Sequence, residues 1–148
     1  MRAVVTRVKN ASVTIDNAVH GAIERGFLVL LGIHVDDGPE QVQKLVDKIT
    51  GLRIFEDDAG KMNLSLSDVG GSLLVISQFT LYGNCKKGRR PEFLSAARPE
   101  TAIPLYEQFV SECKNRGFTV ETGAFGAYMQ VASVNDGPVT LILDTENL

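Results

Sequence analysis

Residues that build metal centres and disulfide frameworks are scarce in this sequence. Its 148 residues include two cysteines, Cys85 and Cys113, and two histidines, His20 and His34. The cysteines form no CxxC pair, and the histidines are not grouped with them. Zinc sites and disulfide scaffolds need such residues in clusters or at short, regular spacing. We therefore expect no metal site and no other cofactor.

Long apolar runs and an excess of basic residues are also absent. No apolar run approaches the ~20 residues that a membrane span requires, and residues 1–7 contain no apolar segment typical of a signal peptide. The net charge is −3, which argues against a protein held on nucleic acid by its overall charge. These absences predict a soluble cytoplasmic protein without a membrane or DNA among its partners, although they leave room for a local basic patch.

The composition that remains suits one globular domain. Hydrophobic residues make up 44% of the sequence and charged residues 22%, which is the ordinary range for a folded chain. A chain of this length buries a hydrophobic core without needing staples. Because there is no repeat, low-complexity tract or linker, we expect residues 1–148 to form a single domain.

Hydrophobic periodicity predicts an α+β fold. Alternating β-branched residues favour strands over residues 4–8 and 12–15, with Asp16-Asn17 as a hairpin turn. Residues 27–33 form an apolar run typical of a strand buried on both faces. Helical spacing covers residues 39–51 and again residues 103–113, where Pro104 is expected in the first turn. We expect a curved mixed β-sheet or barrel with two or three helices packed outside it.

A predicted strand over residues 73–81 changes character along its length. Its first half is wholly apolar, and the polar residues Ser77, Gln78 and Thr80 follow. Alternation along a strand places Gln78 and Thr80 on one face and Ser77 on the other. Two interpretations stay open: the strand emerges into solvent, or its polar end lines a cleft, because buried polar groups must find partners.

Residues 135–140, Asn-Asp-Gly-Pro-Val-Thr, carry a turn signal. They lie between two apolar segments, residues 128–134 and 139–143, which predict a closing pair of strands. Taken alone, the segment is a hairpin connection between these two strands.

One loop concentrates positive charge on this otherwise acidic chain. Lys86, Lys87, Arg89 and Arg90 lie within five residues of one another. Such a run is often only a solvated loop, but it also suits contact with nucleic-acid phosphates. Cys85 lies beside these charges and is a minor candidate for a nucleophile.

The two polar segments together resemble the signatures of one family. Residues 77–81 resemble the SQFTL signature of the D-aminoacyl-tRNA deacylases, also called D-tyrosyl-tRNA deacylases. Residues 135–140 resemble the NxGPVT signature of the same family. Neither motif departs from the pattern, and the resemblance extends over nearly the whole chain.

This resemblance implies an enzyme that hydrolyses the ester between a D-amino acid and tRNA, and mischarged glycyl-tRNA as well. It implies a homodimer with active sites at the subunit interface. Gly137-Pro138 would be cis and would reach into the partner's site, where its backbone carbonyls exclude an L side chain, and Arg7 would hold this loop. The aminoacyl group and terminal adenosine would be bound by Ser77, Gln78, Phe79 and Thr80. The contacts with tRNA would come from Lys86, Lys87, Arg89 and Arg90.

The residues by themselves leave other functions open. A non-catalytic RNA-binding module would use the basic loop, although the RNP-type aromatic pattern is missing. A metabolic enzyme would need a small-molecule pocket, and no phosphate-binding glycine motif supports one. No strong side-chain base is evident, because His20 and His34 are expected to be structural or exposed. We therefore expect Thr80 to position the substrate, while the resemblance implies that the terminal ribose hydroxyl of tRNA helps to activate water.

Overall fold

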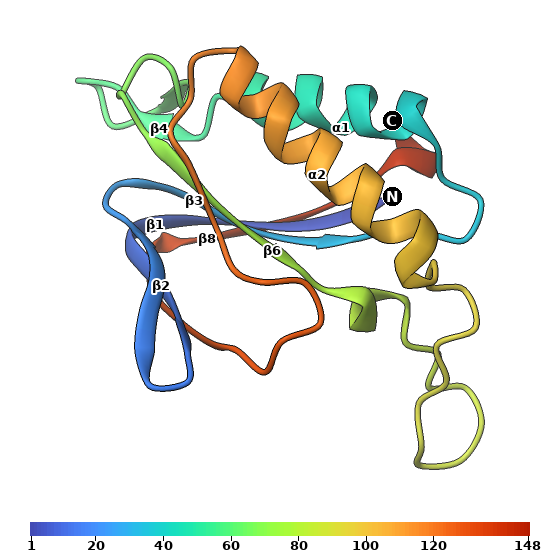
Figure 1. The fold of residues 1–148 in the computed structure, drawn as a ribbon. Coiled ribbons are helices and arrows are strands. Elements are labelled where there is room, and N and C mark those ends of the chain that lie inside the picture. Colours follow the sequence, from blue (N-terminus) through green and yellow to red (C-terminus); the bar gives the residue numbers. More distant parts are fainter.

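The computed structural model describes residues 1–148 as a curved β-sheet with two α-helices on one side (Figure 1). The elements in chain order are β1 (Arg2–Ile15), β2 (Ala18–Ile23), β3 (Gly26–Gly32), α1 (Pro39–Gly51), β4 (Phe55–Glu56), β5 (Met62–Leu64), β6 (Ser72–Ser77), the 3-10 helix η1 (Phe79–Tyr82), α2 (Pro99–Asn115), β7 (Val120–Thr122), β8 (Gln130–Asp144) and the 3-10 helix η2 (Thr145–Asn147). The predicted α+β class, with two helices outside a mixed sheet, is confirmed.

The sheet is built around β1, which pairs with three strands. It runs antiparallel to β8 along most of its length, and on its other side it pairs with β3 and then with β2. Beyond β3, the sheet continues through β6 and β7 in parallel orientation. The far end of β2 returns toward β7, where His20 Nδ1 lies 2.8 Å from the carbonyl oxygen of Thr122. The sheet is therefore a nearly closed barrel, as expected.

The main core lies between the sheet and the two helices. β3 is buried along nearly its whole length, which confirms a strand covered on both faces. The α1 residues that face this core are Val42, Leu45, Val46 and Ile49. The α2 residues that face it are Ala102, Leu105, Tyr106, Phe109, Val110 and Cys113. No helix of the structure is long and apolar enough to cross a membrane.

Three local predictions have different outcomes in the structure. The hairpin turn at Asp16-Asn17 is confirmed, since both residues have the positive φ that a two-residue hairpin turn requires. The strands predicted over residues 4–8 and 12–15 are one continuous strand, β1. The position of Pro104 was wrong: α2 begins at Pro99, so Pro104 lies inside the helix. The apolar pattern begins late because only Ala102 is buried in the first turn.

Candidate active site

The segment that begins at Ser77 leaves the sheet sooner than predicted. Ser77 is the last residue of β6, paired with Leu31 of β3, and the Gln78 amide still donates to the Leu31 carbonyl at 2.8 Å. After Gln78 the chain turns into η1, in which the Leu81 amide donates to the Gln78 carbonyl at 3.2 Å. The expected alternation of Gln78 and Thr80 on one strand face is therefore wrong, because Thr80 lies in a 3-10 turn.

Gly32 provides the space into which η1 folds. A Cβ atom at this position would lie 3.1 Å from the Gln78 carbonyl oxygen and 3.2 Å from the Leu81 Cβ. These distances are tighter than ordinary van der Waals contact. The turn thus lies directly over the end of β3, at a place where any side chain would crowd it.

Three of the four predicted pocket residues line one cavity of about 250 Å³. Ser77, Gln78 and Phe79 form one wall, and the opposite wall comes from residues 126–129, together with Ile76 and Val131. Thr80 is not among the lining residues, and its hydroxyl oxygen accepts a hydrogen bond from the Gln78 side-chain amide. Tyr128 and Met129 were not predicted as pocket residues, because the apolar pattern of residues 128–134 predicts a plain strand.

The cavity contains no side chain that acts as a strong base. Its lining includes no carboxylate, histidine, cysteine or lysine, and its ionisable side chain is the phenol of Tyr128. Cys113 lies in the core, where burial raises the pKa of its thiol to about 12. Cys85 is exposed on the basic loop. The ring of His34 packs against Tyr82, at a distance of 5.2 Å between ring centroids. The side chains that line this cavity are therefore neutral.

The second predicted motif is not a hairpin. Residues 128–143 do not fold back on themselves, because one strand, β8, runs through the motif and pairs with β1 on both sides of it. Asn135 pairs with Val8 and Thr140 pairs with Thr6, so residues 136–139 form a bulge opposite a single β1 residue. A bulge of this kind interrupts the ladder and re-aims the backbone without ending the strand. The turn signal was therefore real, but it marks an irregularity within a strand.

Arg7 is the β1 residue opposite this bulge, and its guanidinium clamps the bulge by hydrogen bonding to its backbone. Its Nε donates to the carbonyl of Asp136 at 2.8 Å, and its Nη1 donates to the carbonyl of Ile54 at 2.7 Å. The side chain is almost fully buried, with 4% of the residue exposed. A buried guanidinium is tolerated only when such bonds satisfy it. Arg7 therefore joins the bulge to the chain leading into β4.

Gly137 and Pro138 form the exposed tip of the bulge, and the peptide bond between them is cis. Gly137 has a φ of 134°, and a Cβ atom there would lie 2.8 Å from Arg7 Nη2. The Val139 amide donates to the Asn135 side-chain oxygen at 2.9 Å, which closes the bulge on itself. The bulge is thus held on its inner side by these contacts, and Gly137 and Pro138 are exposed on its outer side.

Within one chain, the two motifs lie apart. The register places Arg7 beside Phe27, near the start of β3, whereas Ser77 pairs with Leu31 at its end. No hydrogen bond or ion pair joins Gly137 or Pro138 to residues 77–80. The structure of the single chain therefore does not bring the two predicted parts of the site together.

The basic loop is an arm that projects from the body beyond η1 (Figure 1). At its base, Asn84 and Glu92 exchange backbone hydrogen bonds at 2.8 and 3.0 Å, and Phe93 packs edge-on against Phe79. At its tip, all four predicted cations are exposed, and none forms an ion pair: Lys86, Lys87, Arg89 and Arg90. The arm therefore starts next to the pocket and ends in free positive charge.

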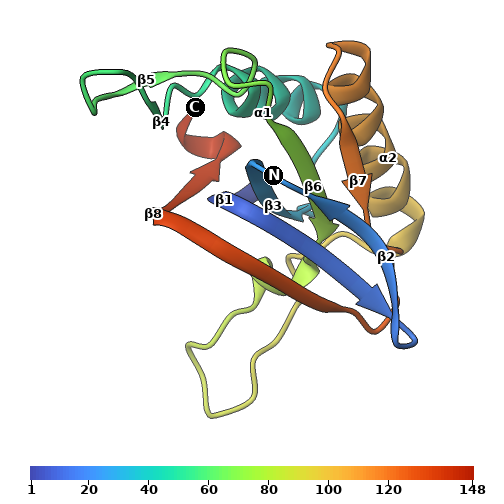
Figure 2. The ribbon, with the colours of Figure 1, turned by 90° about the vertical axis from the view of Figure 1, so that its left-hand side faces the viewer.

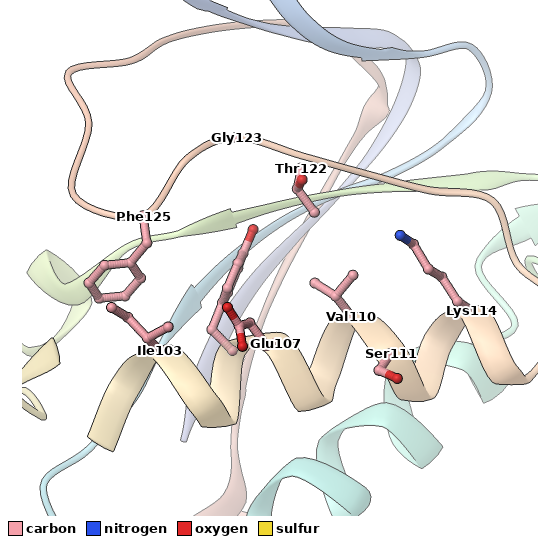
Figure 3. A pocket seen from close by; sticks show the side chains of 9 residues that line it. Ile103, Glu107, Val110, Ser111, Lys114, Thr122, Gly123 and Phe125 are labelled. Atoms are coloured by element: carbon pink, nitrogen blue, oxygen red, sulfur yellow. The ribbon is translucent and has the colours of Figure 1, made fainter. Parts of the chain in front are cut away.

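A second groove of about 420 Å³ lies between α2 and the segment that follows β7 (Figure 3). Tyr106 and Phe125 form part of its apolar wall, while Glu107 and Lys114 line it along the helix. Phe125 precedes residues 126–129, which line the cavity beside Ser77. The same loop therefore borders both hollows.

The sequence of this chain matches a known protein family. A sequence model described as D-Tyr-tRNA(Tyr) deacylase matches residues 4–144. The chain belongs to this family. A relative from Thermosipho africanus (strain TCF52B), named D-aminoacyl-tRNA deacylase, is 57% identical over 148 residues, covering 100% of this chain and 99% of its own.

Solved structures agree with membership of the D-Tyr-tRNA(Tyr) deacylase family. One, titled c-Myc DNA Unwinding Element Binding Protein, has a TM-score of 0.91 and 42% identity, covering 97% of this chain and 98% of its own. Another, titled as a probable eukaryotic D-amino acid tRNA deacylase, has a TM-score of 0.83 and 18% identity, covering 96% and 97% of the two chains. At 18% identity the second comparison concerns the fold alone.

Proposed function

We propose that this protein hydrolyses the ester bond of D-aminoacyl-tRNA. Water adds to the ester carbonyl, and the products are a free D-amino acid and a tRNA with a free terminal hydroxyl. The observation that carries the proposal is the cavity of Ser77, Gln78 and Phe79, which adjoins a basic arm and contains no strong side-chain base. An aminoacyl ester is already activated, so a site that positions water and stabilises the oxyanion suffices.

The groups available for catalysis are backbone amides and the substrate's own hydroxyl. The first amides of a 3-10 turn have no partner within the turn, so those of Phe79 and Thr80 are candidates for donors to the oxyanion. Thr80 positions the substrate, because a threonine without an adjacent base is a weak nucleophile. The ribose 2′-hydroxyl beside the ester activates the water.

The Thr80→Ala variant should lose about tenfold in kcat. A tRNA substrate with a 2′-deoxy terminus should be hydrolysed far more slowly still. Trapping an aminoacyl-Thr80 ester would contradict the positioning role of Thr80.

Selection of the D configuration is assigned to a partner subunit. Gly137 and Pro138 are exposed, lie apart from their own chain's cavity and are clamped by Arg7. In an isologous dimer, each tip would enter the other subunit's cavity and block the space of an L side chain. Glycyl esters have no side chain to block, so glycyl-tRNA should also be cleaved.

The exposed apolar surface of β8 supports this dimer. β8 is an edge of the sheet (Figure 2) and pairs with β1 alone. Large hydrophobic residues on or near it remain exposed: Tyr128, Val131, Val134 and Ile142. Exposed apolar groups along an edge strand are typical of an interaction site. Light scattering should therefore give twice the chain's 16.1 kDa, and an active monomer would refute the cross-subunit arrangement.

The deciding experiment compares release of amino acid from D-tyrosyl-tRNA, L-tyrosyl-tRNA and glycyl-tRNA by the purified protein. We expect hydrolysis of the D and glycyl substrates and protection of the L substrate. A chelator should not change the rates, since the cavity offers none of the carboxylate, histidine or cysteine ligands that hold catalytic metals. No release from D-tyrosyl-tRNA would overturn the proposal.

A second candidate is a nucleic-acid-binding protein without catalysis. The observations that favour it are the unpaired cations of the basic arm and the likeness to the 42% identical structure, which is named c-Myc DNA Unwinding Element Binding Protein. The same assay separates the two candidates, because a binding module would retain aminoacyl-tRNA without hydrolysing it. Competition by duplex DNA of equal charge would then show whether the arm distinguishes tRNA.

A further inference from the structure

Arg2, the first residue of β1, reaches across to the turn that carries Phe79 and Thr80. Its Nη1 donates to the carbonyl of Leu81 at 2.7 Å. Its guanidinium also lies over the ring of Tyr82, 4.7 Å from the ring centroid. Both acceptors belong to η1, whose carbonyls at its C-terminal end lack partners within the turn. One side chain therefore holds the end of η1 by a charged hydrogen bond and by stacking.

The geometry of β1 and β3 explains why Arg2 is the residue that makes this contact. Arg2 pairs with Gly32 in the antiparallel ladder, and paired residues carry their side chains on the same face. Gly32 has no side chain, and η1 occupies the space above it. Arg2 thus lies beside the position at which η1 packs closely over β3.

A third contact fixes the guanidinium in place. Arg2 Nε donates to Asp144 Oδ2 at 2.9 Å, and Asp144 Oδ1 accepts from the Glu146 amide at 3.1 Å. Asp144 is the last residue of β8 and pairs with Arg2 in the ladder. Because the carboxylate is held by both bonds, the planar fork of Arg2 has one orientation, with its remaining edge directed at Leu81.

We propose that Arg2 is a positioning residue for the deacylation reaction, acting through η1 and oriented by Asp144. The side chain touches η1 at its Leu81–Tyr82 end, away from Phe79 and Thr80, and it does not line the cavity. It sets the position of the turn relative to Ser77 and Gln78, on which the placement of the oxyanion donors depends. This inference rests on the proposed function, but its structural half is measured separately.

The test compares Arg2→Met and Arg2→Lys with a matched control, Arg116→Met. Arg116 also forms an ion pair with an aspartate, and its side chain is 31% exposed against 34% for Arg2, but it lies far from η1 in contact with Asp47 and Thr50 of α1. For each variant, steady-state kcat and KM on D-tyrosyl-tRNA are measured, together with the midpoint of unfolding. Amide hydrogen exchange is followed at Leu81 and Gly83, whose amides close the turn.

We expect both Arg2 variants to lose about tenfold or more in kcat at unchanged KM, and to exchange the Leu81 and Gly83 amides at least tenfold faster while the rest of the sheet stays protected. Lysine should not rescue, because one ammonium cannot bond Asp144 and Leu81 while stacking on Tyr82. Arg116→Met should leave kcat and exchange unchanged. Asp144→Ala should reproduce the effect, and combining it with Arg2→Met should add little.

Three results would overturn the inference. Unchanged exchange at Leu81 and Gly83 in Arg2→Met would show that Arg2 does not hold the turn. A raised KM that lysine restores would make Arg2 a direct contact for tRNA phosphate. A loss of kcat matched by an equal loss of folded protein would make it a general stabilising residue. If the wild type itself fails to hydrolyse D-tyrosyl-tRNA, the proposed function fails, while the exchange measurement still decides whether Arg2 holds η1.

Discussion

The η1 turn and the bulge of β8 are both held in place by an arginine, but the two arginines differ in burial. Each is an irregular piece of backbone that presents part of the candidate site, and each is held by an arginine from β1. Arg7 clamps the bulge from inside the protein, where its side chain is 5% exposed and bonds two carbonyls. Arg2 holds the turn from the rim, where its side chain is 34% exposed.

This difference in burial separates the two consequences of losing a clamp. A buried guanidinium leaves unsatisfied carbonyls behind when it is removed, so stability suffers first. When a partly exposed guanidinium is removed, water takes its place, so the loss affects mainly how precisely the segment is positioned. The comparison predicts that the two arginines will be distinguished by stability and not by activity alone.

The largest effect is expected for Arg7→Met. This change deletes two charge-assisted hydrogen bonds, one to the buried carbonyl of Ile54 and one to the part-buried carbonyl of Asp136, which should lower the free energy of unfolding by about 3 kcal/mol. Urea denaturation measures it, with Arg116→Met as the exposed control at under about 1 kcal/mol. Equal losses for Arg7→Met and Arg2→Met would remove the distinction drawn from burial.

Gly137→Ala tests the bulge itself. The new methyl group would meet Arg7 Nη2 at 2.8 Å and Val139 Cγ2 at 2.9 Å, with the backbone at a φ of 134°. We expect activity to fall at least about tenfold with a stability loss of about 1–2 kcal/mol. Gly60→Ala is the control, since it too has a positive φ but nothing within 4 Å. If both variants behave alike, backbone strain and not crowding explains the effect.

Neutralising the basic arm should leave both clamps untouched. Changing Lys86, Lys87, Arg89 and Arg90 to alanine removes exposed charges that make no ion pairs. The KM for tRNA should rise about tenfold at physiological salt and its salt dependence should flatten, while kcat and the unfolding midpoint stay unchanged. A salt slope equal to that of the wild type would mean that the arm is only solvated.

The smallest effect concerns the pH dependence of the Arg2 clamp. Burial alone would raise the pKa of Asp144, but hydrogen bonds from the Glu146 amide and Arg2, with the charge of Arg2, lower it below its ordinary value. A carboxyl group whose pKa is lowered in the folded state stabilises the protein at pH values above its unfolded-state pKa. This stabilisation is lost as the pH falls through the folded-state pKa. Asp144→Asn should therefore cost about 1 kcal/mol at neutral pH, and this difference should shrink below about pH 4. A difference that stays constant down to pH 3 would contradict the linkage.

Local sequence signals were reliable wherever the conformation of an element depends on its own residues. The helix over residues 39–51, the hairpin at Asp16-Asn17 and the buried strand after residue 26 all follow from periodicity and turn chemistry within a few residues. The two motif segments were found for the same reason, since their residue types are unusual for their places in the chain. Their functional roles remain proposals.

What the local sequence left undetermined is how each motif is bent. The strand that holds Ser77 ends because its neighbour β3 ends at Gly32, and the Asn135 motif becomes a bulge because β1 offers pairing partners on both sides of it. A strand and a hairpin were reasonable predictions from segments read alone. Only the tertiary structure decided between them, because hydrogen bonding to a neighbouring strand is a property of the pair, and the clamps Arg2 and Arg7 lie about 80 and 130 residues away from the carbonyls they bind.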